Sequence, residues 1–237
     1  MKQPAWAYAL FPAMLDAQST QAFARIQVRR VEHVLNDAPS APDAWLSESE
    51  QLRLQRLKIA NRRAQFLSGH WLVRRLLNQQ FGKPASDWQL IERTNLPPAV
   101  LGFAEVQISI SHSGDWIAAA ISNSAIGIDL EQRRERAGLL RFQQLLLAPG
   151  EALDSLDLDQ LLQRWVAKEA WIKRQHGSAL PEQLAELKLM PASPESATVR
   201  LHSTAAFHLA ITAQAKPALW HVELGGNAVL RMAYWQL

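Results

Sequence analysis

The sequence predicts an α+β fold made of two similar halves. Two stretches have the apolar spacing of helices, at residues 62–80 and 159–175, and short runs with strand-like alternation surround them. The turn and apolar strand of "HSGDWIAAAIS" return as "HSTAAFHLAITA" later in the chain. We therefore divide the sequence into an N-terminal half, residues 1–124, and a C-terminal half, residues 125–237, which includes a C-terminal extension.

The helices of the N-terminal half have start and stop signals. Ser47 and Glu50 have the spacing of a capping box and predict the start of a helix. The helix over residues 62–80 is followed by Gly82, a residue type that often ends helices. His70 lies on the apolar stripe of this helix, and we interpret it as a core histidine.

Three strand-like runs follow and predict a three-stranded meander. They are "VQISIS" at residues 106–111, "WIAAAIS" at 116–122 and "IGIDLE" at 126–131. The turns "HSGD" and "NSA" separate them, so each strand is expected to pair with the one before it.

The C-terminal half contains one long helix and further strands. Asp159 is the expected N-cap of the helix over residues 159–175, and Gly177 is its expected stop. The strand-like runs are "ELKLM", "ATVRLHS", "FHLAITA", "LWHVEL" and "VLRMAYW".

The composition excludes several classes of protein. The chain has no cysteine, which excludes a disulfide framework and thiolate sites and is typical of a cytoplasmic protein. No apolar run approaches the length that spans a bilayer. The first residues, "MKQPAWAYALFPAML", place a lysine before an apolar stretch, but Pro4 and Pro12 interrupt it. We therefore expect a first strand there and no signal peptide.

Positive charge is concentrated in one stretch of the chain. The formal net charge is only +3, but residues 51–86 contain no aspartate or glutamate. The basic residues of this stretch are Arg53, Arg56, Lys58, Arg62, Arg63, Arg74, Arg75 and Lys83. Such a surface attracts nucleic acid, a polyphosphate cofactor or an acidic protein, unless it is only the solvated face of a helix.

Two carboxylates share one face of the run "IGIDLE". Because side chains alternate along a strand, the apolar residues face one way, whereas Asp129 and Glu131 face the other way, ~7 Å apart. Neighbouring acids raise each other's pKa unless a cation lies between them, and such oxygen ligands suit Mg²⁺ or Mn²⁺. A solvated strand face is the alternative interpretation.

A third carboxylate interrupts the apolar stripe of the helix over residues 159–175. Glu169 lies four residues after Trp165 and three before Ile172, and therefore faces the same side. A buried carboxylate persists only with a cation, a metal or a proton. Lys173 would pair with it on an exposed helix, but the inward position favours a metal or catalytic role. Together, the three acids predict magnesium-dependent phosphoryl chemistry on a phosphorylated substrate.

The motifs resemble those of the 4′-phosphopantetheinyl transferases. "SISHSGDW", "GIDLE" and "WVAKEAWIK" occur in the order and at the spacing of the family, and the resemblance spans roughly residues 53–180. The length and two-half layout resemble the large monomeric surfactin-synthetase (Sfp) type, not the short trimeric holo-acyl-carrier-protein synthase type. The resemblance implies a monomer whose halves are related by a pseudo-twofold axis, with the active site at their interface.

The resemblance also implies the reaction and its partners. Coenzyme A would donate its 4′-phosphopantetheine arm to a serine of an apo acyl or peptidyl carrier protein, releasing adenosine 3′,5′-bisphosphate. The carrier would be an acidic protein of fatty-acid, polyketide or nonribosomal-peptide biosynthesis. No nucleic acid and no membrane are expected as partners.

Catalytic and metal-binding roles follow from the same resemblance. Asp129, Glu131 and Glu169 match the acids of the family's Mg²⁺ site, for which Mn²⁺ is the alternative metal. Glu169 also matches the general base. Lys173 matches a lysine near the pyrophosphate that would stabilise the leaving phosphate. Lys168 matches the other lysine of that motif and is expected to contact coenzyme A.

Further residues match the coenzyme A site. Ser111 and His112 match the "SHS" block, whose histidine contacts the 3′-phosphate in the family. Arg63, with Arg62 beside it, matches an arginine expected at the same phosphate. The family's Gly-Lys-Pro lysine has no counterpart, because the segment in register is "NLPP" and "FGKP" comes too early. We expect Arg93 to supply that charge.

Two other functions compete with this one. Another Mg²⁺-dependent phosphoryl-transfer enzyme, such as a nuclease, would use the same acids and bind DNA with its basic helices. Many such nucleases place Glu-x-Lys on the second strand, whereas Glu131 is followed by "QRR" and the third acid comes from a helix. A non-catalytic binder of acidic carrier domains would not require three convergent acids.

Overall fold

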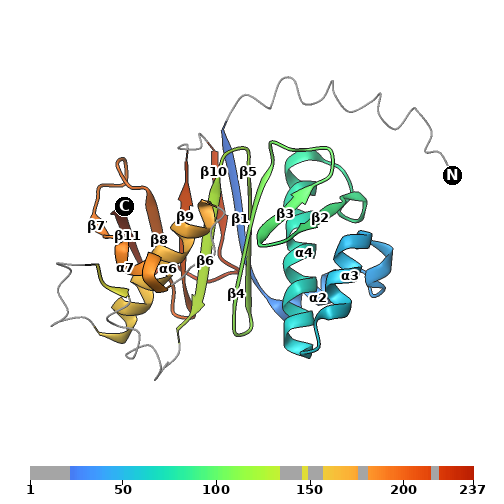
Figure 1. Ribbon diagram of the computed structural model, residues 1–237, viewed down its shortest axis with the longest axis horizontal. Coiled ribbons are helices and arrows are strands. Elements are labelled where there is room, and N and C mark those ends of the chain that lie inside the picture. The colour runs from blue at the N-terminus through green and yellow to red at the C-terminus, as the bar shows by residue number, and fades with distance from the viewer. Residues whose placement is uncertain (1–21, 134–145, 149–156, 176–180, 215–218) are drawn as a thin grey trace.

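The computed structural model describes residues 22–133, 146–148, 157–175, 181–214 and 219–237. Helices and strands both form in these ranges, with helices on the two outer sides of a central group of strands (Figure 1). The predicted α+β class is therefore confirmed. Within the described ranges, no helix has both the length and the apolarity needed to cross a membrane.

The elements of the N-terminal part begin with a strand that the sequence patterns did not predict. They are β1 (Phe23–Arg30), α2 (Val31–Asp37), η2 (Pro42–Ala44), α3 (Glu48–Arg56), α4 (Ala60–Phe81), η3 (Ala85–Asp87), β2 (Leu90–Arg93), β3 (Leu96–Val100), β4 (Gln107–Ser113) and β5 (Trp116–Ser122). The first strand expected near the N-terminus lies outside the described residues.

The C-terminal part adds one long helix and a second set of strands. They are β6 (Ile126–Gln132), α6 (Leu158–Arg174), α7 (Pro181–Glu186), β7 (Met190–Pro191), β8 (Val199–Ser203), β9 (Phe207–Ala213), β10 (Leu219–Glu223) and β11 (Arg231–Gln236). The run "ELKLM" is mostly not a strand, because α7 ends at its first residue and only the last residue belongs to β7.

The strands form two main sheets and a small ribbon. The four-stranded sheet has the order β10-β1-β5-β4, the five-stranded sheet has the order β6-β9-β8-β11-β7, and β2 pairs with β3. β4 and β5 form the expected antiparallel hairpin, whereas β6 pairs with β9. The predicted meander is therefore wrong. The third run opens a new sheet because its partner is a strand far along the chain.

Serine side chains join the two sheets where β4 and β6 meet. Ser109 Oγ accepts a hydrogen bond from the Ile128 N–H (3.0 Å), and Ser111 Oγ accepts one from the Leu130 N–H (3.1 Å). These hydroxyls satisfy backbone donors that a neighbouring strand would otherwise pair. The alternating serines of "SISHS" therefore form a structural seam between the sheets.

The predicted helix signals of the N-terminal part are confirmed. Ser47 and Glu50 form both bonds of the capping box at the start of α3. Gly82 ends α4 in the left-handed conformation, with φ of 76°, which a residue without Cβ adopts easily. His70 is 5% exposed, as a core histidine should be.

The start of α6 differs from the prediction. Its N-cap is Asp157, whose side chain accepts a hydrogen bond from the Gln160 N–H at 2.7 Å. Asp159 lies inside the first turn and bonds elsewhere, so it is not the cap. α6 ends at Arg174, and the expected stop, Gly177, lies outside the described residues.

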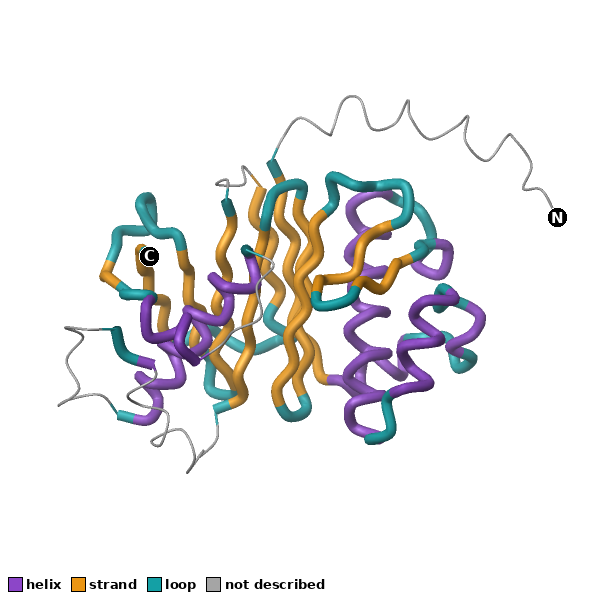
Figure 2. The backbone as a smooth tube through the Cα atoms, in the orientation of Figure 1, coloured by secondary structure: helices purple, strands orange, loops and turns teal. Residues whose placement is uncertain are grey.

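The two sheets and two helices stack in layers around three apolar clusters (Figure 2). One cluster lies between α4 and β5, and a second lies between α6 and the strands β8 and β9. The third joins the facing sides of the sheets, with members on β1, β5, β6 and β9. This arrangement positions α6 and β6 against each other, close to the seam with β4.

The boundary expected between residues 124 and 125 falls between β5 and β6. The two parts are nevertheless interleaved, because β10 pairs in parallel with β1 in the first sheet. The two segments of similar sequence form the antiparallel hairpins β4–β5 and β8–β9. The division into similar halves and the pseudo-twofold relation stay predictions.

Candidate active site

Asp129 is the most enclosed acid of the site. Its neighbours Ile128 and Leu130 point into the core between the sheets, and the alternation of β6 places Asp129 on the opposite face, as predicted, where it meets β4. Asp129 Oδ1 accepts hydrogen bonds from Ser111 Oγ (2.7 Å) and Lys173 Nζ (2.6 Å). Asp129 Oδ2 is buried and has no hydrogen-bond partner among the described residues, which leaves an acceptor for a further group.

Glu131 follows on the same face and is partly exposed. It accepts a short hydrogen bond from Ser113 Oγ, the last residue of β4. The two predicted acids of β6 are therefore each bonded to a serine of β4. This pairing extends the seam between the sheets into the candidate site.

Glu169 lies on the side of α6 that turns toward β6. Its neighbours on the helix stripe, Leu162 and Val166, are buried, whereas Glu169 itself is half-buried. Burial, together with the nearby charges of Asp129 and Glu131, raises the pKa of Glu169 to about 7. Lys173 opposes this shift without cancelling it. A carboxyl group in this position exchanges its proton near neutral pH.

Lys173 pairs with Asp129 and not with Glu169. Its ammonium donates to Asp129 Oδ1 and to Ser111 Oγ, at 2.6 and 3.2 Å. Burial alone would lower the pKa of Lys173, but the charge and hydrogen bond of Asp129 outweigh this effect and raise it. The simple pair one helical turn apart is therefore not what holds Glu169 in place.

A glycine allows α6 to lie this close to β6. A Cβ atom added at Gly127 would overlap Ala170 O and would lie 2.5 Å from Arg174 N. These are backbone atoms of α6, which cannot move aside as a side-chain end does. The glycine of "GIDLE" therefore belongs to the site, a role that the sequence reasoning did not assign.

The three predicted acids are neighbours, but their side chains do not lie close enough together to bind one metal ion as they stand. Asp129 and Glu131 both act on the pKa of Glu169, so all three share one electrostatic environment. In the described part of the chain, no three histidine, aspartate or glutamate side chains lie close enough together to hold a metal ion as they stand. The metal assignment stays a prediction.

His112, near the end of β4, lies beside Arg62 of α4. Arg62 Nη1 lies 3.1 Å from His112 Nε2, and both side chains are exposed. Loss of solvent around the ring, together with the cations Arg62 and Lys173, lowers the pKa of His112. A neutral histidine beside an arginine is a suitable arrangement for an incoming anion.

Lys168 lies away from this group. It is fully buried, and its ammonium donates to the backbone carbonyls of Leu146 (2.5 Å) and Leu184 (3.0 Å). These bonds tie α6 to the segments that contain those residues. The placement supports a structural role for Lys168 and gives no support to the predicted contact with coenzyme A.

Arg63 and Arg93 occupy different environments. Arg63 Nη1 donates to the carbonyls of Leu54 (2.7 Å) and Leu57 (3.3 Å), at the end of α3. Such bonds favour a helix-capping role. Arg93 is exposed and donates from Nε to Pro97 O at 2.8 Å. Its remaining guanidinium nitrogens are therefore available for a ligand.

Two adjoining cavities border the β2–β3 ribbon. The smaller, of about 220 Å³, is bordered by Lys173, Ser109 and the prolines of "NLPP". The larger, of about 540 Å³, is bordered by Arg53, Arg56, Glu92 and Arg93. Asn95 and Leu96 line both cavities, so they adjoin at these residues. The sequence showed Arg53 and Arg56 only as members of a basic stretch.

Comparisons with known proteins find similarity to one family. Residues 125–233 match the family model of the 4′-phosphopantetheinyl transferase superfamily. The chain is 27% identical over 143 residues to 4′-phosphopantetheinyl transferase psf-1 of Bacillus pumilus, over 57% of this chain and 59% of that protein. It is 28% identical over 122 residues to 4′-phosphopantetheinyl transferase Sfp of Bacillus subtilis (strain 168), over 48% and 54%.

A third relative with a similar level of identity is also a 4′-phosphopantetheinyl transferase. The chain is 25% identical over 148 residues to 4′-phosphopantetheinyl transferase ffp of Bacillus subtilis, over 60% of this chain and 65% of that protein. The chain thus spans between 54% and 65% of the length of these curated relatives. The motifs, the family model and the relatives agree, and they support an Sfp-type 4′-phosphopantetheinyl transferase.

Proposed function

We propose that the protein transfers the 4′-phosphopantetheine arm of coenzyme A to a serine of an apo acyl or peptidyl carrier protein. Adenosine 3′,5′-bisphosphate is the second product. The observation that carries the proposal is the meeting of Asp129, Glu169 and Lys173 at the seam of β4, β6 and α6, where Lys173 borders the smaller cavity. The family resemblance supports the same reaction.

The transfer step requires a base and a charged partner for phosphate. In our proposal, Glu169 accepts the proton of the carrier serine while the serine oxygen bonds to the phosphorus of the phosphopantetheine group. The bond from that phosphorus to the bridging oxygen breaks, and this oxygen leaves with adenosine 3′,5′-bisphosphate. Lys173 stabilises the leaving phosphate, because its ammonium, which donates to Asp129, borders the smaller cavity.

The donor atoms suit a Mg²⁺ ion, with Mn²⁺ as the alternative. Asp129, Glu131 and Glu169 offer oxygen only, and the buried Oδ2 of Asp129 has no partner among the residues described. Binding would require these side chains to turn toward one another, because they do not form a metal-binding group as they stand in the described part of the chain. When bound, the ion would offset charge on the pyrophosphate.

Coenzyme A would extend from this group across the cavities. Arg93, with Arg53 and Arg56, provides a basic wall for the nucleotide part in the larger cavity. Arg62 and His112 are placed to meet a phosphate at the outer end of β4. Ser111 acts by positioning Asp129 and Lys173, because its hydroxyl bonds to both.

The partner would be an acidic carrier protein, and we propose a monomeric enzyme of the cytoplasm. The exposed arginines of α3 and the start of α4 would attract acidic side chains as well as coenzyme A. Fatty-acid, polyketide and nonribosomal-peptide carriers all have suitable chemistry.

Mass spectrometry of an intact apo carrier protein tests the proposal. The carrier is incubated with coenzyme A, Mg²⁺ and the enzyme, and we expect the mass to rise by one phosphopantetheine group. Glu169→Gln should nearly abolish the shift, whereas Glu105→Gln, at an exposed site, should not. The absence of modification across fatty-acid, polyketide and peptidyl carriers would contradict the proposal.

Metal removal tests the metal separately. Treatment with a chelator should stop the transfer, and added Mg²⁺ or Mn²⁺ should restore it. Transfer that continues at full rate in the chelator would contradict the metal assignment but would leave the reaction itself in place.

A further inference from the structure

The larger cavity has a carboxylate in its basic wall. Glu92 is the acid that borders it, together with Arg53, Arg56 and Arg93. Three guanidinium groups favour a phosphate, and a nearby carboxylate works against the same ligand. The position of Glu92 is therefore informative about what the cavity binds.

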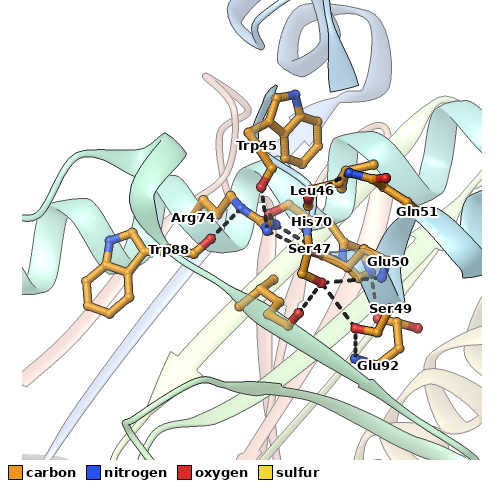
Figure 3. A network of polar contacts seen from close by, with 11 residues as sticks. Trp45, Leu46, Ser47, Ser49, Glu50, Gln51, His70, Arg74, Trp88 and Glu92 are labelled. Carbon is orange, nitrogen blue, oxygen red and sulfur yellow. Dashed lines mark hydrogen bonds and ion pairs between the residues drawn. The ribbon is translucent and has the colours of Figure 1, made fainter. Parts of the chain in front are cut away.

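Glu92 is held from both its backbone and its side chain (Figure 3). Its N–H donates to Ser49 Oγ at 3.1 Å, which joins β2 to the first turn of α3. Its Oε1 lies 3.5 Å from His70 Nε2 and is buried, without a hydrogen-bond partner among the described residues. The side chain as a whole is 23% exposed, so one end of the carboxylate remains accessible from the cavity.

A buried ionic network fixes the histidine that faces Glu92. His70 Nδ1 lies 2.7 Å from Glu50 Oε1, and Arg74 donates to both Glu50 oxygens at 2.8 and 2.6 Å. Arg74 also donates to the carbonyls of Trp45 and Trp88. Burial would raise the pKa of Glu50, but the bonds from His70 and Arg74 lower it to about 2. Glu50 is therefore ionised and is bound by both His70 and Arg74.

Burial and nearby charges determine how favourable a hydrogen-bond donor is next to the Glu92 carboxylate. Burial, helped by the charge of Glu50, raises the pKa of Glu92, and His70 and Arg53 only partly oppose this. These are the charged groups that act on it from α3 and α4. Because Oε1 is buried, a ligand donor in the cavity would reach the exposed part of the side chain, and a hydrogen bond there would lower the free-energy cost of keeping the carboxylate partly buried.

We propose that Glu92 determines the specificity of this cavity by accepting a hydrogen bond from an amino or hydroxyl group of a phosphorylated ligand. The arginines hold the phosphate, and Glu92 selects those anions that also carry a donor. This inference rests on the proposed function, in which the ligand is the nucleotide part of coenzyme A. The donors of that part are the amino group of adenine and the ribose hydroxyl.

Isothermal titration calorimetry tests this without any transfer reaction. Adenosine 3′,5′-bisphosphate is compared with purine riboside 3′,5′-bisphosphate, which lacks the amino group and adds no donor, and with 2′-deoxyadenosine 3′,5′-bisphosphate, which lacks the hydroxyl. The wild-type protein should prefer the adenosine compound over one of the analogues by roughly tenfold or more, because the other groups stay the same. The analogue that binds worse identifies the donor.

The variant Glu92→Ala should lose this preference. Inorganic pyrophosphate has no such donor. It should bind to Glu92→Ala at least as tightly as to the wild type, because the variant lacks the carboxylate that repels it. Glu105→Ala, at an exposed glutamate outside the cavity, is the matched control and should keep the preference. Glu92→Leu, which keeps roughly the size of the side chain but has no acceptor, serves if the alanine variant folds poorly.

Several results would overturn the inference. They are equal binding of all three nucleotides by the wild type, an unchanged preference in Glu92→Ala, or equal weakening of every anion. The last result would show that Glu92 only supports the wall of the cavity. Normal carrier modification with any of these results refutes this inference alone, whereas a Glu92-dependent preference without carrier modification refutes the proposed transfer.

Discussion

At the scale of single residues, Asp129 connects most of the candidate site. It accepts from Ser111 and Lys173 and contributes to the pKa shifts of Lys173 and Glu169. Strand alternation and helix periodicity were sufficient to predict which faces Asp129 and Glu169 occupy. They were not sufficient to predict that Lys173 pairs with Asp129, because this depends on how α6 lies on β6.

Replacing the charge of Asp129 should separate activity from folding. In Asp129→Asn the size is kept, but Lys173 loses its anionic partner and the site loses one predicted metal ligand. We expect the rate of carrier modification to fall by about 10²-fold or more, with a melting temperature close to that of the wild type.

The exposed variant Asp87→Asn is the control for the loss of one negative charge. Both proteins are compared by initial rates at saturating coenzyme A and by circular dichroism on heating. A wild-type rate in Asp129→Asn would remove Asp129 from the catalytic machinery.

Two contacts between elements decide where the site lies. The first is the approach of α6 to β6 over Gly127. Sequence patterns predicted both elements and nearly their bounds, but the need for glycine appears only when the helix is placed on the strand.

The second contact joins α3, α4 and β2 through Glu50. The capping box was predictable from Ser47 and Glu50, whereas the bonds of Glu50 to His70 and Arg74 were not.

Adding one methyl group at Gly127 should push α6 from β6. Gly127→Ala meets backbone atoms, and we expect a loss of roughly 1–3 kcal/mol in the free energy of unfolding, together with reduced transfer. Gly69→Ala is the comparator, because its new Cβ would meet only side-chain ends, Ile110 at 3.0 Å and Ile117 at 3.2 Å. Urea denaturation measures both. Equal losses in the two variants would contradict the backbone contact as the cause.

The network around Glu50 should make stability depend on acid pH. Its folded pKa, about 2, lies below the ordinary value of 4.5, so its contribution is present above pH 4.5 and is lost as the pH falls toward 2. The shift corresponds to about 3 kcal/mol. In Glu50→Gln the buried Arg74 also loses its anion, so the variant should be less stable at neutral pH.

Urea titrations at several pH values between 7 and 2.5 test this dependence. The difference in unfolding free energy between wild type and Glu50→Gln should shrink as the pH falls. Glu48→Gln, at an exposed position in the same helical turn, should show no such trend. A difference that stays constant with pH would show that Glu50 acts by packing alone.

At the scale of the whole molecule, local patterns predicted the class of fold but not the connections between strands. The hairpins β4–β5 and β8–β9 join neighbours in the chain, and the sequence runs that form them were recognised. The pairings β6–β9 and β1–β10 join segments far apart in the sequence, and no local signal specifies them. The predicted meander failed for this reason.

The apolar cluster between the sheets should make the chain unfold as one unit. Trp116 of β5 and Phe207 of β9 meet there with ring centroids 4.9 Å apart, and both are buried. Phe207→Ala removes a contact that belongs to both sheets, and we expect it to cost about 3–5 kcal/mol. Because the sheets share this core, unfolding of the variant should remain a single transition with its midpoint at a lower urea concentration. The slope of the unfolding free energy against urea concentration should stay the same.

Far-ultraviolet circular dichroism and tryptophan fluorescence should agree on one midpoint within each protein, and the midpoint of the variant should be the lower of the two. Phe66→Ala, on α4 and packed against the cluster between α4 and β5, provides the comparison with a side chain outside the core that the sheets share. Two separate transitions in Phe207→Ala would mean that each sheet folds with its own helices. In that case β10 and the serine seam would be too weak to couple the sheets, and the position of α6 beside β4 would not depend on the shared core.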